Sequence, residues 1–296
     1  IQITRIEVWV TNRRGSFDDA RDVEGFADLG EPQHLNNSFI QLTSPSSPVP
    51  TNSANSLYST LTASPSLRQL SALSSGLPAL RPALDYERIE SARRLAPSEY
   101  TLHNTLGYLS LTTPLAADEA LAVAYEFTYE GKVYRVGEFA ADQSEGTSSL
   151  LFVKLLKGTD FSPKAPTWPL MMRNAYRLGA GITALQRAGF QLDVVYRDDA
   201  TGRALPYLPD GPLKGKQLLS VLGLDRLDAQ QEARSDGHFD FVEGYTIRSS
   251  EGLVFFPTTE PFGSTLTTAL GAGSWSDRYA FPELYTMTAV EAAQRS

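Results

Sequence analysis

The stretch DGHFDFVEGYTIRSSEGLVFFP, residues 236–257, carries the clearest hairpin pattern in the chain and decides the fold prediction. Two apolar runs, residues 244–247 and 253–256, flank a polar loop that contains Gly252. β-Branched and aromatic runs around a short loop with a glycine are typical of a β-hairpin. The same frame, Tyr-Thr-aliphatic followed after four residues by Gly-x-aliphatic, occurs at residues 100–109. Two hairpins with matching spacing predict a duplicated β unit.

A second repeated pattern supports the duplication. Residues 120–136 alternate apolar and polar side chains around a Glu-Gly turn, which predicts a strand pair with one buried face. Within this pair, Val-x-Tyr is followed after five residues by Gly and a basic residue at 123–132, and the same spacing recurs at 194–203. The period is irregular, which favours two related β units with insertions over a solenoid.

The predicted fold class is therefore mainly β with short helices (α+β), built as two related antiparallel β units, sandwich-like, with long loop insertions. The first unit is expected at residues 1–146 and the second at 165–296, with a connecting strand or linker at 147–164. The first unit contains a Ser- and Pro-rich insertion, residues 43–82, that is typical of a surface excursion or linker. Deleting residues 51–76 from this insertion is accordingly expected to leave the fold intact.

Periodicity and turn residues predict the remaining elements. Strands are expected at residues 1–10, 150–156, 190–196 and 284–288. Helices are expected at residues 67–77, 85–95, 170–178 and 215–227, the last with Leu218, Leu219, Leu222 and Leu227 inward. Residues 289–295 are expected as a short helix or frayed tail, the acidic segment 16–42 as a solvated loop or short helix, and the Gly-, Thr- and Ala-rich segment 265–276 as a loop.

Composition excludes several classes of function. The 296 residues, 42% of them hydrophobic, are enough for a globular chain with a substantial core. The net charge of −8 disfavours a nucleic-acid partner, because a phosphate backbone requires a clustered basic surface. The chain has no cysteine, which excludes disulfides and thiolate metal sites, and no apolar run approaches the roughly 20 residues of a membrane helix. Because it starts at Ile1 without a Met or signal peptide, we expect a processed chain or a piece of a longer one.

The sequence assigns no catalytic, cofactor-binding or metal-binding residue. The three histidines, His34, His103 and His238, do not have the spacing of a metal-binding helix. The cluster around His238 contains Asp236 and Asp240, and an Asp-Gly pair before a strand is usually turn chemistry. We therefore predict that these two aspartates bind no metal and close the turn through hydrogen bonds from side chain to backbone.

Other motifs are incomplete. Residues 271–275 lack a glycine of the nucleophile-elbow pattern, and residues 179–181 lack the third glycine of a dinucleotide loop. Carboxylates are plentiful, but their spacing singles out no glycosidase pair. Trp168, Trp275 and Tyr134 are candidates for an aromatic binding platform, although packing in the core is the favoured role for each.

Several segments resemble the SprA/Sov family, the giant outer-membrane translocon proteins of the type IX secretion system. Their order fits the family, and they span most of residues 1–288. The Ser- and Pro-rich residues 43–82 match no pattern of the family. The segments that carry the resemblance are IQITRIEVWVTNRRG, RLAPSEYTLHNTLGYLSL, DEALAVAYEFTYEGKVYRVGEF, LLFVKLLKG, WPLMMRNAYRLGA, YRDDATGRALPYLP and DGHFDFVEGYTIRSSEGLVFFPTTEPFG.

The resemblance implies a role in protein export. Members of the family form a very large β-barrel that exports folded cargo, with soluble insertions that close or decorate the pore. This chain lacks the long series of roughly 10-residue lipid-facing strands of a barrel wall. We therefore expect a non-enzymatic structural and interaction module near the pore mouth, outer-membrane-associated and facing the extracellular side or the periplasm.

The expected partners follow from the same resemblance. They are the rest of the parent barrel, its accessory proteins and secreted cargo, with no nucleic acid, no cofactor and membrane contact only through the parent protein. The alternative is a cell-surface carbohydrate- or peptide-binding β-sandwich, which a solvent-exposed aromatic platform would favour. A third hypothesis is a hydrolase, which a cleft with two convergent carboxylates would favour.

Overall fold

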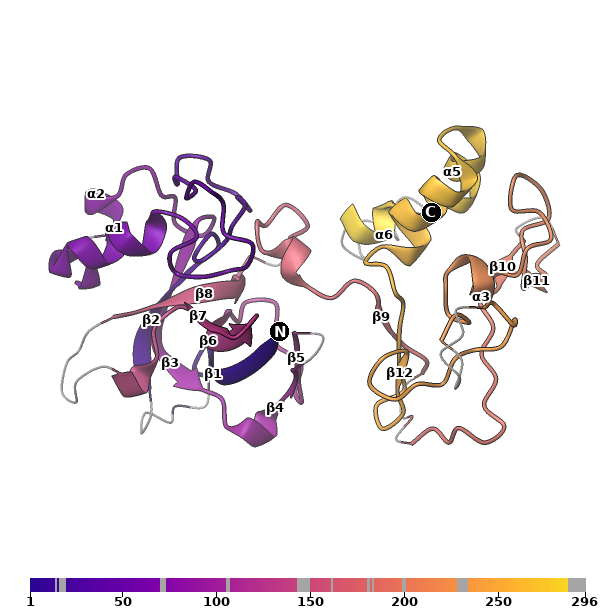
Figure 1. Cartoon of the computed structure of the whole chain (residues 1–296), viewed down its shortest axis with the longest axis horizontal. Coiled ribbons are helices and arrows are strands. Elements are labelled where there is room, and N and C mark those ends of the chain that lie inside the picture. The colour runs from indigo at the N-terminus through magenta and orange to yellow at the C-terminus, as the bar shows by residue number, and fades with distance from the viewer. Residues whose placement is uncertain are drawn as a thin grey trace. The chain divides into compact units, whose positions relative to one another are not determined.

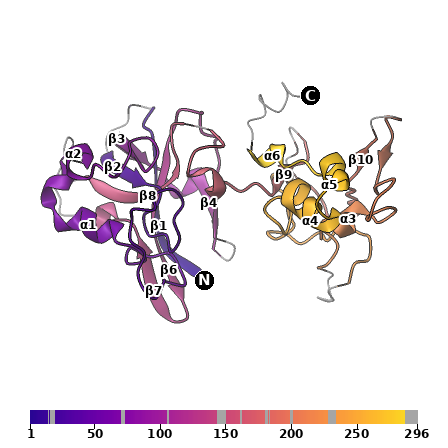
Figure 2. The same cartoon turned by 90° about the horizontal axis from the view of Figure 1, so that it is seen from above.

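The chain forms two compact units, Ile1–Met171 and Met172–Ser296, and each is described here by itself (Figure 1, Figure 2). The computed structural model describes residues 1–13, 15, 20–69, 73–104, 107–142, 150–160, 162–179, 182, 184–198, 201–227 and 234–286. The mainly β fold class with short helices is confirmed.

Six strands of the first unit form one sheet in the order β1-β3-β2-β8-β6-β7, and β1 also pairs with β6. Because of this extra pairing, β1, β3, β2, β8 and β6 form a closed ring, and closure removes the free edges of a sheet. Every pair is antiparallel except β2–β8, so the expectation of purely antiparallel units is wrong there. The strands are β1 (Gln2–Val10), β2 (Arg21–Phe26), β3 (Tyr86–Arg94), β6 (Leu121–Tyr129), β7 (Lys132–Val136) and β8 (Leu151–Lys157).

The strands of the ring are covered on both faces. Trp9 packs in one apolar cluster with Phe139, whereas its neighbours Val8 and Val10 pack in another with Val123. The prediction of a strand at residues 1–10 is confirmed, and both faces of β1 are buried at its end. Strand β8 is a member of this sheet, so residues 151–157 are not a linker between units.

The hairpin predicted at residues 100–109 is confirmed. It consists of β4 (Tyr100–His103) and β5 (Tyr108–Leu111), preceded by η2 (Pro97–Glu99), and residues 105–106 of its loop lie outside the described residues. Tyr100 and Leu111 pair across it and pack with Val8 and Val10 on the outer face of β1. The hairpin therefore covers part of the ring.

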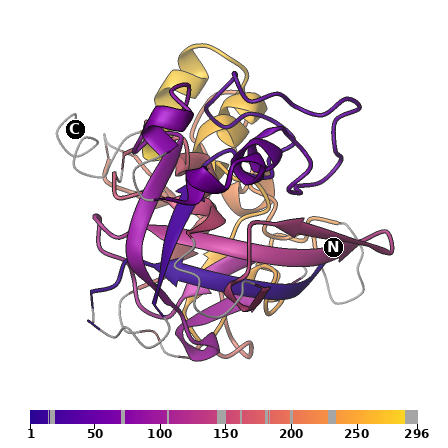
Figure 3. The ribbon, with the colours of Figure 1, turned by 90° about the vertical axis from the view of Figure 1, so that its left-hand side faces the viewer.

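The Ser- and Pro-rich stretch also covers the ring, so its prediction as a surface excursion or linker is wrong (Figure 3). It forms α1 (Leu57–Ala63), η1 (Pro65–Arg68) and α2 (Leu73–Gly76). Leu57, Leu61 and Leu73 are buried in one cluster with Phe26 of β2 and Phe152 of β8. The predicted helix at residues 67–77 corresponds to η1 and α2, and residues 70–72 lie outside the described residues.

The acidic segment is part of the core rather than a solvated loop. Strand β2 is one of the strands of the ring, between β3 and β8, and Asp28 after it is buried. The Asp28 carboxylate accepts hydrogen bonds from the backbone N–H groups of Leu35 at 2.6 Å and Asn37 at 3.0 Å. Lys154 of β8 forms an ion pair with Glu31 at 2.6 Å. Backbone donors and a buried lysine therefore offset the cost of burying these carboxylates. Asp18 and Asp19 lie outside the described residues.

Residues 85–95 form strand β3 and not the predicted helix. The register between β2 and β3 shifts, because Arg21 pairs with Ala92 while Val23 pairs with Ile89. This bulge contains Ser91, whose φ is 47°, and its N–H donates to Asp22 at 2.7 Å. An extra residue changes which face the following side chains point to. The bulge therefore places Ile89 and Ala92, three positions apart, in one cluster, and Tyr86 packs in the cluster on the other face; the three buried residues together have the spacing of a helix.

The described residues of the second unit form two small sheets. One has the order β12-β13-β9 and the other pairs β10 with β11. The predicted hairpin around Gly252 is confirmed, with Ile247 opposite Val254 and Arg248 opposite Leu253. The strands are β9 (Ala175–Arg177), β10 (Tyr196–Arg197), β11 (Ala204–Leu205), β12 (Ile247–Arg248) and β13 (Leu253–Phe255).

The repeated hairpins of the two units occupy different sheet positions. Hairpin β4–β5 forms a sheet of its own, whereas its predicted counterpart β12–β13 pairs with β9. Hairpin β6–β7 lies in the large sheet, whereas its predicted counterpart β10–β11 forms a sheet of its own. The sheets of the two units therefore do not show the predicted duplication.

Short helices surround the core of the second unit. They are α3 (Leu218–Val221), η5 (Pro261–Thr265), α4 (Leu266–Leu270), α5 (Ser274–Tyr279) and α6 (Glu283–Thr286). The predicted helix at residues 215–227 is confirmed in α3, but Leu227 is 50% exposed and not inward. Leu219, Ile247, Val254 and Tyr279 are central members of the core.

Three predictions for this region are wrong. Residues 265–276 form α4 and the start of α5 rather than a loop. Residues 283–286 form α6 rather than a strand, and residues 287–296, including the predicted tail, lie outside the described residues. Residues 168–177 form η4 (Trp168–Leu170) and β9 rather than a helix. Of the strand predicted at residues 190–196 only Tyr196 is paired, although Phe190, Leu192 and Val194 pack against the core as the alternation predicts.

Candidate functional site

The residues singled out in the sequence do not come together in one site. His34 and His238 are exposed, and His103 stacks on Tyr108 with the ring centroids 5.0 Å apart. Asp236 accepts a hydrogen bond from the N–H of His238 at 2.8 Å, which closes the turn as predicted. Asp240 accepts instead from the N–H of Leu227, so it ties two distant segments together. Within the described part of the chain, no group of three or more His, Asp or Glu side chains is placed to hold a metal ion.

The three aromatic candidates have different surroundings. Trp168 is partly buried, and Tyr134 stacks on Phe127 at 5.5 Å. Trp275 is 37% exposed and lies parallel to Tyr279, with the ring centroids 6.4 Å apart. Trp275 is therefore the one of the three that is exposed enough to meet a ligand.

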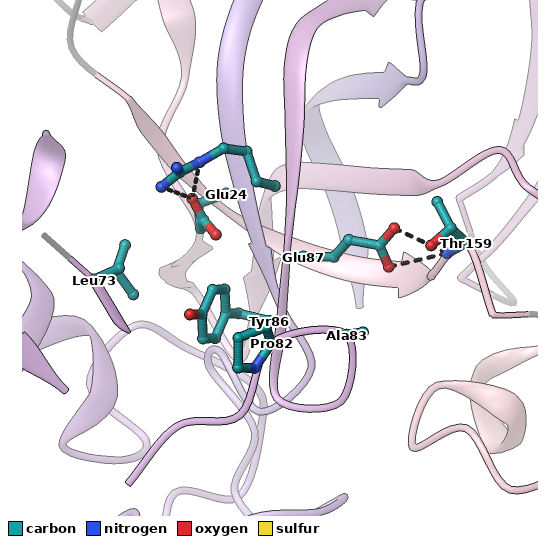
Figure 4. A pocket seen from close by; sticks show the side chains of 8 residues that line it. Glu24, Leu73, Pro82, Ala83, Tyr86, Glu87 and Thr159 are labelled. Carbon is teal, nitrogen blue, oxygen red and sulfur yellow. Dashed lines mark hydrogen bonds and ion pairs between the residues drawn. The ribbon is translucent and has the colours of Figure 1, made fainter. Parts of the chain in front are cut away.

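A pocket of the first unit brings together residues that the sequence analysis did not connect. It has a volume of 370 Å³, within the range of roughly 300–1,000 Å³ for ligand pockets. Strands β2 and β3 supply its charged side chains, and α2 and the turn after β8 supply further walls (Figure 4). We call it the Glu24 pocket; it is lined by Glu24, Leu73, Pro82, Ala83, Tyr86, Glu87, Arg88 and Thr159.

Glu24 is the buried charge of this pocket. Its residue surface is 0% exposed, and it lies opposite Arg88 in the β2–β3 register. The guanidinium of Arg88 donates to Oε2 of Glu24 through Nε at 3.0 Å and forms an ion pair through Nη2 at 2.9 Å. Both contacts of Arg88 go to Oε2, so Oε1 of Glu24 is not bound by this guanidinium.

The second oxygen of Glu24, Oε1, is buried and accepts no hydrogen bond from the described residues. Leaving a buried acceptor unpaired costs roughly 1–3 kcal/mol, and more for a charged group. Burial raises the pKa of the Glu24 carboxyl above its ordinary value, and the nearby Arg88 lowers it in part. The pocket therefore contains a carboxylate that lacks one hydrogen-bond donor.

Glu87 lines the same pocket but faces away from Glu24. It lies opposite Gly25, the neighbour of Glu24, and adjacent strand residues point to opposite faces of a sheet. Both oxygens of Glu87 accept from the N–H of Thr159, at 3.0 and 2.9 Å, and Figure 4 shows the two carboxylates pointing apart. This is not the convergent pair that the hydrolase hypothesis requires.

A smaller pocket of 210 Å³ lies between the ends of β1 and β3 and the β4–β5 hairpin. Its charges are matched within the chain, because Arg93 forms an ion pair with Glu99 at 2.7 Å and Arg13 with Glu119 at 3.5 Å. The Glu24 pocket is the stronger candidate, since its unpaired acceptor belongs to a fully buried side chain.

The pH dependence of stability provides a test of the buried Glu24. Because the pKa of Glu24 is higher in the folded chain, its contribution to stability is fully present below the unfolded pKa of about 4.3 and is lost as pH rises through the folded pKa. We expect the stability of the wild type relative to Glu24→Gln to fall between pH 4 and neutrality, by about 1.4 kcal/mol for each unit of pKa difference. Urea unfolding of both proteins across this range measures it.

Glu90→Gln is the matched control, because it removes an exposed carboxylate from the neighbouring strand, β3. It corrects for the general effect of one less negative charge. A constant difference between wild type and Glu24→Gln from pH 4 to 7 would contradict the raised pKa.

Comparison with known proteins adds no family assignment: no protein-family model and no curated protein matches the chain. Among the described residues, no helix combines the length and the apolar character needed to cross a membrane.

Proposed function

We propose that the chain is a non-enzymatic structural and interaction module of a type IX secretion translocon, placed near the pore mouth. The observation that carries the proposal is the ordered series of segments that resemble the SprA/Sov family. These segments supply much of the framework: they contain β1, the β4–β5 hairpin, the β6–β7 pair, β8 and the β12–β13 hairpin. Strands that form a scaffold are what a module shared within a family of large translocons would retain.

The second unit offers a surface for partners. Phe281 is 39% exposed and Leu284 is 51% exposed, and the N–H of Leu284 donates to the carbonyl of Phe281 at 3.2 Å. The two side chains thus lie on one turn at the start of α6. Exposed apolar side chains that lie together favour a protein contact over solvent. We propose that this pair contacts the parent barrel or one of its accessory proteins.

Secretion by cells that produce the parent translocon tests this role. Phe281→Asp combined with Leu284→Asp is expected to reduce cargo secretion several-fold without changing the amount of translocon or the circular dichroism of this chain. Ala269→Asp, which places the same charge at an exposed position of α4, is the control and is expected to leave secretion unchanged. Normal secretion by the double variant would oppose a contact at this turn.

The location is tested separately. The chain has no cysteine, so Ser59→Cys on the exposed side of α1 introduces a single reactive thiol. A membrane-impermeant maleimide is expected to label it in intact cells if the module faces outward, or after permeabilisation of the outer membrane if it faces the periplasm. Labelling only after lysis of the inner membrane would exclude both expected locations.

The alternative function, binding of a carbohydrate or peptide at the cell surface, has one observation in its favour. Trp275 exposes part of its ring and stacks on Tyr279, whose hydroxyl donates to Asp210, and Asp210 forms an ion pair with Arg278 at 3.0 Å. An aromatic face next to polar groups is a common arrangement for a sugar. Binding of glycans that Trp275→Ala abolishes, together with unchanged secretion by the Phe281 and Leu284 variant, would favour this alternative.

A further inference from the structure

The Glu24 pocket lacks one specific partner. Oε2 of Glu24 is held by Arg88, whereas the buried Oε1 has no donor among the described residues. An ionised carboxylate accepts hydrogen bonds and donates none. The missing group is therefore a hydrogen-bond donor that reaches the pocket from outside this set of residues.

The charge of the lining indicates which kind of donor fits. Glu24 and Glu87 contribute two carboxylates, and Arg88 contributes one guanidinium. With both carboxylates ionised, the pocket has an excess of one negative charge, which favours a cation over an anion. The ring of Tyr86 lines the same space, and aromatic faces attract cations.

The number of open hydrogen-bond acceptors decides whether a guanidinium or an ammonium group fits the pocket better. A guanidinium is best bound by two carboxylate oxygens in a fork. Here one oxygen of Glu24 already binds Arg88, and Glu87 points to the opposite face of the sheet, where it binds the N–H of Thr159, so Oε1 of Glu24 has no second oxygen beside it to complete a fork. A single open acceptor suits the compact ammonium group, which needs no fork.

The remaining walls suit an aliphatic stem. Leu73, Pro82 and Tyr86 present apolar surface beside the charged residues. A lysine side chain buries its methylene groups against apolar surface and directs its charged end to a polar partner. We propose that the Glu24 pocket binds a primary ammonium group at Oε1 of Glu24, with its alkyl stem against Leu73, Pro82 and Tyr86. This inference is independent of the translocon proposal.

Amide chemical shifts of the full chain provide the test. The probes are N-acetyl-lysine methylamide, its norleucine analogue without the amino group, and n-butylammonium. The lysine probe is expected to cause saturable shifts at Glu24, Leu73, Tyr86 and Thr159, and the norleucine probe none. Shifts spread over the surface, or equal binding of the norleucine probe, would refute an ammonium site whether or not any variant folds.

Variants then assign the contact. Glu24→Gln is expected to weaken binding of the lysine probe about tenfold or more, because one charge-assisted hydrogen bond is lost. Glu90→Gln, the exposed change on the neighbouring strand β3, is expected to bind as the wild type does. Equal affinity of the wild type and a folded Glu24→Gln would overturn the proposal.

The same titration identifies the source of the ammonium group. Similar affinities for n-butylammonium and the lysine probe would indicate a site for a free amine. Tighter binding of the lysine probe, which carries a peptide group on each side, would indicate a lysine of a partner segment. Both results support an ammonium site.

Discussion

Deletion of residues 51–76 is expected to unfold the first unit, the opposite of what composition alone predicts. Among its described residues, the deleted segment contains four buried leucines, Leu57, Leu61, Leu67 and Leu73. Truncation of one such side chain to alanine typically costs about 2–5 kcal/mol, and a whole domain is stable by only about 5–15 kcal/mol. By simple addition the loss of all four costs about 8–20 kcal/mol, which is as large as the whole stability of an ordinary domain.

Near-ultraviolet circular dichroism and thermal unfolding measure this effect. Loss of the aromatic signal and of the cooperative transition of this unit is expected. Leu61→Ala is the graded version, with an expected loss of about 2–5 kcal/mol, and Thr60→Ala next to it on α1 is an exposed control with an expected change within about 0.5 kcal/mol. A deleted chain that melts as the wild type does would show that the leucines contribute little.

This expectation changes how export can be tested. A deletion that unfolds the unit would also impair secretion, because any misfolded module disturbs its parent protein. Point substitutions at exposed positions, such as Phe281 and Leu284, separate a lost contact from a lost fold.

Local signals made the hairpins predictable. Glu130 and Gly131 have φ values of 50° and 74°, the positive pair that a two-residue hairpin turn requires. A glycine at the second position and alternating residues on both sides of the turn are visible in the sequence. The hairpin around Gly252 is predicted by the same signal, a glycine in the turn, and the φ of Gly252 is 63°.

The closure of the first unit's strands into a ring was not predictable from local sequence patterns. In a ring covered on both faces, polar and apolar side chains are buried together, so Glu24 and Lys154 are interior although their types favour the surface. The bulge at Ser91, together with burial on both faces of β3, gave this strand the three-residue spacing of a helix. Serine and proline content correctly indicated irregular backbone at residues 43–82, but only the buried leucines show that this backbone is packed.

The candidate site was missed for a related reason. Glu24, Leu73, Arg88 and Thr159 come from four segments that are far apart in the chain. No motif connects them, and a single glutamate between valine and glycine carries no local signal of burial. Only the β2–β3 register places Glu24 against Arg88, and that register depends on the bulge.

Glu138→Ala is expected to destabilise the first unit by about 3–5 kcal/mol, the usual cost of removing one partner of a buried ion pair. Glu138 is 2% exposed, and its two oxygens bind the guanidinium of Arg68 at 2.8 and 2.5 Å. The same carboxylate accepts from the hydroxyl of Tyr58 at 3.2 Å and from the N–H of Phe152 at 3.0 Å. The substitution thus removes a shared acceptor of α1, η1 and β8.

The double variant Arg68→Met with Glu138→Leu distinguishes an unpaired charge from lost packing. Replacing both members of a buried pair by apolar side chains of similar volume is often close to neutral, whereas removing one leaves a buried charge without a partner. We therefore expect urea unfolding to show a much smaller loss for the double variant than for Glu138→Ala. If both lose the same stability, the contribution of Glu138 lies in its bonds to Tyr58 and Phe152. If neither loses stability, the ion pair does not hold the Ser- and Pro-rich stretch on the sheet, and its buried leucines are sufficient.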